Sequence, residues 1–152
     1  MRPFAALIVL AVLFASRAHP QTTAASASGL KPDQIPADCK AVDGYFPIDI
    51  QTAILWQKTD LYKSVMPLPV SKTAQSFTCQ GNKGTVYFFQ FGSEADRKTA
   101  AAFIKPLLWG ESGPTQDHPE LVLEVGDIVS VVSFRKTPKQ LLAAIQNGIA
   151  HK

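Results

Sequence analysis

Residues 120–134 read ELVLEVGDIVSVVSF, and this stretch decides the fold class of the chain. Two runs rich in Val, Leu and Ile, 120–125 and 128–134, lie on either side of Gly126-Asp127. A two-residue Gly-x connection between such runs is typical of a β-hairpin with a type II′ turn. The sequence therefore predicts two antiparallel strands here.

A second hairpin is expected upstream. Residues 75–80 and 85–91 (TVYFFQF) have strand composition, and Gly81-Asn82-Lys83-Gly84 joins them with the glycines and asparagine typical of a hairpin turn. The same glycines do not fit a phosphate-binding loop, because that motif needs a longer glycine spacing and a following helix. Together the two hairpins predict a four-stranded antiparallel sheet.

Helices are expected after each hairpin. Ser93 is the predicted N-cap of the first, which should end near Lys105 because Pro106 follows. We expect Ala95, Ala102 and Phe103 on its buried side.

The last helix should begin at Thr137-Pro138. Its expected apolar face consists of Leu141, Leu142, Ile145 and Ile149. A third helix is predicted within 45–70 from the spacing of its apolar residues. The expected fold is an α+β two-layer sandwich, in which two hairpins form a four-stranded antiparallel sheet packed with two or three helices.

The chain has 152 residues, and its beginning reads as a secretory signal peptide over 1–18. Residues 4–15 are apolar, and small residues place a cleavage site after Ala18, with Ala27 as the alternative. This apolar stretch spans about 18 Å as a helix, which is too short for a hydrocarbon core of about 30 Å. We therefore expect a flexible spacer over 19–38, a single domain over 39–152, and a secreted or periplasmic location without a membrane span.

Cleavage also changes the charge. The leader carries Arg2 and Arg17 and no acid, so its removal lowers the bases from 15 to 13 against 12 acids and leaves a net charge of +1. Such a chain lacks the basic surface expected of a nucleic-acid-binding protein. The densest basic groups are two pairs, Arg97-Lys98 and Arg135-Lys136, which we interpret as solvated surface charges.

The chain has two cysteines, Cys39 and Cys79, and an exported protein is expected to join them. The bond would close a loop of about 40 residues and stabilise the fold by roughly 4 kcal/mol in the chain-entropy model. It would tie the start of the domain to the first predicted hairpin.

Few residues suggest catalysis. An Asp117-His118 pair in a loop could serve a small hydrolase, but no nucleophile motif accompanies it. Glu120 and Glu124 lie four apart on one predicted strand, which we interpret as a solvated strand face. The histidines and cysteines do not suggest a closed zinc site, and no cofactor is expected.

Aromatic residues offer another kind of site, because they can line a ligand groove or belong to the core. The set in question is Tyr45, Phe46, Trp56, Tyr62 and Trp109.

Both faces of the predicted strands carry apolar side chains. Either residues 45–70 cover the second face, or a surface that includes Phe88, Val129 and Val131 is open to a partner. The sequence thus favours a small exported, non-enzymatic binding or accessory domain for a protein or a hydrophobic small molecule. The alternative is an extracytoplasmic hydrolase that uses the Asp117-His118 loop.

Overall fold

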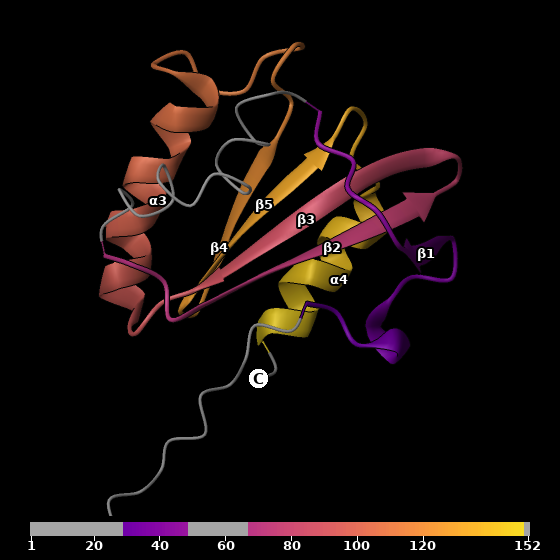
Figure 1. Cartoon of the computed structure of the whole chain (residues 1–152), viewed down its shortest axis with the longest axis horizontal. Coiled ribbons are helices and arrows are strands. Elements are labelled where there is room, and N and C mark those ends of the chain that lie inside the picture. Colours follow the sequence, from indigo (N-terminus) through magenta and orange to yellow (C-terminus); the bar gives the residue numbers. More distant parts are fainter. Residues whose placement is uncertain (1–28, 49–66, 151–152) are drawn as a thin grey trace, which may run out of the picture.

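The computed structural model describes residues 29–48 and 67–150 (Figure 1). The predicted signal peptide and residues 49–66 of the predicted third helix lie outside the described residues. The described part of the chain forms a five-stranded antiparallel sheet in the order β1-β2-β3-β5-β4. Its strands are β1 (Cys39–Val42), β2 (Ser71–Cys79), β3 (Asn82–Gln90), β4 (Leu121–Val125) and β5 (Ile128–Phe134).

Two α-helices lie within the described residues, α3 (Glu94–Trp109) and α4 (Lys139–Ala150), together with the short 3-10 helix η1 (Pro32–Gln34). The predicted four-stranded sandwich with up to three helices is therefore wrong. The missed strand is β1, which pairs with the last four residues of β2. Its sequence, CKAV, is too short for a period-two pattern, so only pairing with β2 makes it a strand.

The helices pack on opposite faces of the sheet, which gives three layers rather than two (Figure 1). Of the four residues predicted for the apolar face of α4, Leu141 and Ile145 are fully buried against one face of the sheet and Leu142 is partly buried there. The helix α3 packs against the other face. The side chains of β3 and β5 alternate between the two cores, because successive residues of a strand point to opposite faces.

The open apolar surface is therefore absent from the described sheet. Phe88 pairs with Ser130 and faces α4, whereas Val129 and Val131 face α3. All three of the named apolar side chains are at most 1% exposed. The hypothesis that they form one binding face is wrong, because they belong to two different buried faces.

The two hairpin turns differ from each other. Gly126 has a φ of 56° and joins β4 to β5, as the sequence predicts. The first turn is shorter than predicted, since Cys79 pairs with Asn82 and only Gln80-Gly81 connects the strands. Both connecting residues have positive φ, 49° and 81°, as a type I′ turn requires.

Gly84 lies inside β3 rather than in the turn, opposite Phe134 of β5. A Cβ atom at this position would lie 2.4 Å from the Phe134 ring and 2.5 Å from the Ser133 carbonyl oxygen. The glycine thus serves the close approach of a buried ring, and a turn-based interpretation of the sequence misplaces it.

Ser93 caps α3 as predicted, because its Oγ accepts a hydrogen bond from the Asp96 amide at 3.1 Å. The predicted end near Lys105 is wrong, since the helix continues through Pro106 to Trp109. Pro106 lies on the exposed side, where the carbonyl group that it leaves free can bond to water.

The predicted buried side of α3 is also wrong. Ala95, Ala102 and Phe103 are exposed. The residues that α3 buries are Ala100, Ala101, Ile104 and Leu108. Ala100 and Ala101 lie four and three positions before Ile104, and Leu108 lies four positions after it, so the four form one stripe that continues past the proline.

Part of the stretch that we assigned to the spacer packs on the domain. Leu30 is 4% exposed and belongs to the core on the α4 face. The Gln75 side chain accepts a hydrogen bond from the Leu30 backbone amide at 2.9 Å and donates one to the Leu30 carbonyl oxygen at 3.1 Å. The described folded unit therefore begins before Cys39.

Candidate ligand-binding site

Residues 44–48 form a strap, which crosses the sheet on the α3 side without joining it as a strand. Three side chains of the sheet hold the strap backbone. The Ser76 hydroxyl donates to the Gly44 carbonyl oxygen at 2.7 Å, and the Thr85 hydroxyl accepts from the Phe46 amide at 2.9 Å. The Ser133 hydroxyl accepts from the Ile48 amide at 3.1 Å. The helix predicted within 45–70 would begin after Asp49, and residues 45–48 precede that position and are neither helix nor strand.

The rings of the strap take fixed positions. Gly44, with φ of 119°, begins the strap, and a Cβ there would lie 3.2 Å from the Phe46 ring. Tyr45 packs edge-to-face on Tyr87 of β3 with ring centroids 5.9 Å apart. Lys83 Nζ lies 5.4 Å from the centroid of the Phe46 ring, within the range of a cation–π contact.

An open groove of about 430 Å³ lies between the strap and the β2–β3 hairpin; we call it the strap groove. Its lining consists of Tyr45, Phe46, Pro47, Ile48, Gly81, Asn82, Lys83 and Arg135. One wall is apolar and aromatic, and the ionised side chains of the lining are both cations. This combination suits a ligand with an apolar part and a negatively charged group.

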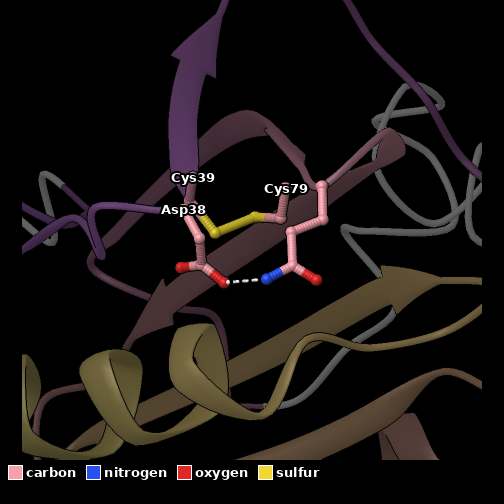
Figure 2. Close-up of a disulfide and its surroundings, with 4 residues drawn as sticks. Asp38, Cys39 and Cys79 are labelled. Carbon is pink, nitrogen blue, oxygen red and sulfur yellow. Dashed lines mark hydrogen bonds between the residues drawn. A yellow bond between two sulfur atoms is a disulfide. The ribbon is translucent and has the colours of Figure 1, made fainter.

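A second groove of about 280 Å³, the hairpin groove, adjoins it and shares Asn82. Its lining consists of Cys79, Gln80, Asn82, Lys136, Thr137, Pro138, Lys139 and Gln140. The predicted disulfide between Cys39 and Cys79 is confirmed, and it joins β1 to β2 beside this groove (Figure 2).

Near the disulfide, Gln80 Nε2 donates to Asp38 Oδ2 at 2.9 Å, and the Gln80 amide bonds to the Asp38 carbonyl oxygen at 3.3 Å. The disulfide and these bonds hold the turn of the hairpin in place. The wall that the two grooves share is therefore anchored to β1.

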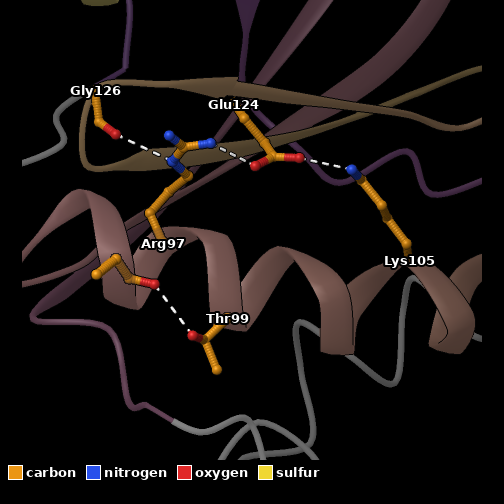
Figure 3. A network of polar contacts seen from close by, with 6 residues as sticks. Arg97, Thr99, Lys105, Glu124 and Gly126 are labelled. Atoms are coloured by element: carbon orange, nitrogen blue, oxygen red, sulfur yellow. Dashed lines mark hydrogen bonds and ion pairs between the residues drawn. The ribbon is translucent and has the colours of Figure 1, made fainter.

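The carboxylates of the β4 region have a different environment. Glu120 is fully buried, and Glu124 bonds to Arg97 and Lys105 of α3 (Figure 3). Arg97 Nε also donates to the Gly126 carbonyl oxygen at 3.1 Å. The predicted solvated strand face is wrong, because Glu120 is fully buried and Glu124 pairs with two cations of α3.

The ion pairs change the titration of Glu124. Burial raises its pKa, but the hydrogen bonds and positive charges of Lys105 and Arg97 outweigh burial and hold the pKa below its ordinary value. Glu124 is thus a charged structural link between β4 and α3.

The Asp117-His118 loop contains a turn between Thr115 and His118. The His118 amide donates to Thr115 Oγ1 at 3.1 Å, and the Thr115 amide donates to the His118 carbonyl oxygen at 3.1 Å, which makes a tight turn. Asp117 is exposed, and within the described residues its carboxylate has no hydrogen bond with which to orient the imidazole. The hydrolase stays a prediction, which an activity screen of His118→Ala against the parent would test.

The predicted aromatic set divides between surface and core. Tyr45 and Phe46 line the strap groove, as a ligand groove would require. Trp109 packs with the α3 core, and its indole Nε1 donates to the Glu120 carbonyl oxygen at 3.2 Å. Trp56 and Tyr62 lie outside the described residues.

Within residues 29–48 and 67–150, no three His, Cys, Asp or Glu side chains gather as metal ligands would. The described helices also include none with the length and apolar character needed to cross a membrane. No protein-family model, no curated protein and no solved structure matches this chain.

Proposed function

We propose that this protein is an exported, non-enzymatic binding domain and that the strap groove is its ligand site. The supporting observation is the preformed apolar wall of Tyr45 to Ile48, held on the sheet by three hydroxyl groups and facing Lys83 and Arg135. A fixed groove binds with less loss of conformational entropy than a mobile one. The ligand class is a small apolar molecule or an apolar segment of a protein.

Export is part of this proposal. The apolar leader and the disulfide support it, because disulfides form and persist in oxidising compartments. Expression of the full chain in a secreting host, followed by N-terminal sequencing, tests it. We expect the exported protein to begin at His19, or at Ser28 if the alternative site is used. Retention of Met1 on the mature protein would contradict the leader assignment.

Binding in the strap groove is tested with a set of small, uncharged aromatic and aliphatic fragments. Amide chemical shifts of the ¹⁵N-labelled exported protein are recorded by nuclear magnetic resonance with each fragment. We expect shifts at Gly81, Asn82 and Lys83, whose residues line the groove. If no fragment changes the chemical shifts of these amides, the proposed site is wrong.

A pair of phenylalanine variants supplies the control. Phe46→Ala removes a ring from the groove wall and should abolish the fragment shifts. Phe103 is 40% exposed on α3, lines neither groove, and is the matched ring. Phe103→Ala should leave the shifts unchanged, and equal losses in both variants would argue against a specific groove.

A further inference from the structure

The two grooves are both lined by positive charge, which is not apparent from the sequence. All the ionised side chains in their linings are cations, Lys83 and Arg135 in the strap groove and Lys136 and Lys139 in the hairpin groove. These cations come from the start of β3, the segment after β5 and the start of α4. Folding therefore gathers four positive charges around Asn82.

These charges are exposed, and none of the four is ion-paired within the described residues. The carboxylate of Asp38 bonds to Gln80, a lining residue of the hairpin groove, and Asp43 directly precedes the strap. The two linings together contain four cations and neither Asp nor Glu, which gives a local positive surplus in a chain of net charge +3. Such a surface attracts anionic ligands and accelerates their association.

The shape narrows the class of anion. The two grooves share the lining residue Asn82, so an elongated ligand that passes over this residue would reach both, and the Asn82 amide can pair with a peptide group. The planar guanidinium of Arg135 matches the two oxygens of a carboxylate. The wall of Phe46, Pro47 and Ile48 accepts an apolar side chain. Carboxylates that alternate with apolar groups along an extended backbone are the chemistry of an acidic peptide.

We propose that the strap and hairpin grooves together bind an acidic peptide segment of a partner protein, with an apolar residue in the strap groove. This inference rests on the proposed binding function and names the chemistry of its ligand. The cations line two grooves rather than a flat face, and a groove suits an extended peptide better than the surface of a membrane does.

The experiment uses fluorescence anisotropy of a labelled synthetic octapeptide that contains four glutamates around a central Phe-Leu pair. A second peptide replaces the glutamates by glutamines and keeps the apolar pair. We expect the acidic peptide to bind the exported protein at least about tenfold more tightly at low salt, since several charge contacts contribute to it. Equal affinity for the two peptides would overturn the proposal.

Matched double variants locate the site. Arg135→Gln/Lys136→Gln should weaken the acidic peptide by about tenfold, and Lys83→Gln/Lys139→Gln should do the same from other elements. Lys31→Gln/Lys98→Gln removes the same net charge at two exposed positions outside both linings and should change affinity by less than about twofold. Equal weakening by this control pair would show a non-specific effect of net charge and overturn the site.

Vesicles that contain phosphatidylglycerol provide the competing surface. Co-sedimentation with these vesicles in the absence of peptide binding would assign the cations to a membrane and overturn the proposal. Failure of the inference is separable from failure of the proposed function. Uncharged fragments that bind the strap groove while the acidic peptide does not would refute only the ligand class, and absence of both signals would refute both.

Discussion

The two Arg-Lys pairs of this chain look alike in the sequence, but their arginines have opposite environments in the fold. Arg97 lies on α3 with its side chain 11% exposed, and it bonds to the Glu124 carboxylate and the Gly126 carbonyl oxygen. Arg135 and Lys136 follow β5, are exposed, and line two grooves without a carboxylate in either lining. One pair thus contributes a structural ion pair, and the other contributes an unneutralised surface.

The difference shows that the role of a charge depends on what the fold places opposite it. Register puts Glu124 on the α3 side of β4, opposite Val129, where Arg97 and Lys105 reach it. The segment after β5 instead meets the β2–β3 hairpin, which contributes a further cation, Lys83. Changes around Arg97 should therefore alter stability, and changes around Arg135 should alter binding.

The largest loss of stability is expected from removal of the disulfide, which lies near Arg135-Lys136 and far from Arg97-Lys98. Cys39→Ala/Cys79→Ala should lower the free energy of unfolding by about 3–4 kcal/mol, because the crosslink closes a long loop of the unfolded chain. Urea denaturation measures this loss. Amide chemical shifts should change at Gln80 and Asn82, which line the hairpin groove next to the bond.

The same variant also tests the comparison of the two Arg-Lys pairs, because it should leave the region around Arg97 unchanged. Amides of α3 around Arg97 should keep their chemical shifts, since the disulfide joins β1 to β2 at the other edge of the sheet. Comparable shifts in α3, or a loss of stability below about 1 kcal/mol, would contradict the local role given to the crosslink.

A smaller effect is expected when the acid of the structural pair is neutralised. Glu124→Gln leaves Arg97, which is largely buried, without its anionic partner and should cost about 2 kcal/mol of unfolding free energy. Arg135→Gln should change that free energy by less than about 0.5 kcal/mol, because this side chain is exposed and lacks an ion pair among the described residues.

Urea denaturation of both variants gives the direct comparison. Glu111→Gln, which neutralises an exposed acid after α3, is the control for loss of one negative charge and should match the parent within about 0.5 kcal/mol. Equal destabilisation by Glu124→Gln and Arg135→Gln would erase the distinction between the pairs.

Local patterns predicted the elements that local chemistry determines. The Gly126-Asp127 turn, the Ser93 cap, the pairing of the cysteines and the buried face of α4 at Leu141 and Ile145 agree with the structure. The first turn was misplaced, because Gly84 resembles a turn glycine. A glycine is needed at this position because the Phe134 ring on the neighbouring strand lies too close for a Cβ atom. The strand β1 was missed, because four residues carry too little periodicity to reveal a partner.

The candidate site was even less predictable. The sequence singled out Tyr45 and Phe46, and the structure places them in the strap groove. The sequence did not suggest the four-cation surface. Lys83 lies far from Arg135-Lys136 along the chain, and Lys139 lies on a different element, α4, so the four cations become neighbours only on folding. The strap is held by the hydroxyl groups of Ser76, Thr85 and Ser133. Serine and threonine are common in strands, so nothing in the sequence around these residues indicates this role.

The smallest predicted effect is a pH dependence confined to the first pair. The pKa of Glu124 is held below its ordinary value in the folded protein, so folding releases a proton from this group at pH values between the folded and the unfolded pKa. The stability that it contributes is fully present above the unfolded pKa of about 4.3 and is lost as the pH falls through the depressed folded pKa.

The difference in unfolding free energy between the parent and Glu124→Gln isolates this contribution from the other acids of the chain. We expect a constant difference between about pH 7 and pH 5 and a smaller one near pH 3, measured by urea denaturation at each pH. The difference between the parent and Arg135→Gln should stay the same over that range, because Arg135 forms no ion pair with a carboxylate in residues 29–48 and 67–150. A Glu124→Gln difference that does not shrink on acidification would show that the carboxylate gains nothing from Arg97 and Lys105, and the two Arg-Lys pairs would then be equivalent after all.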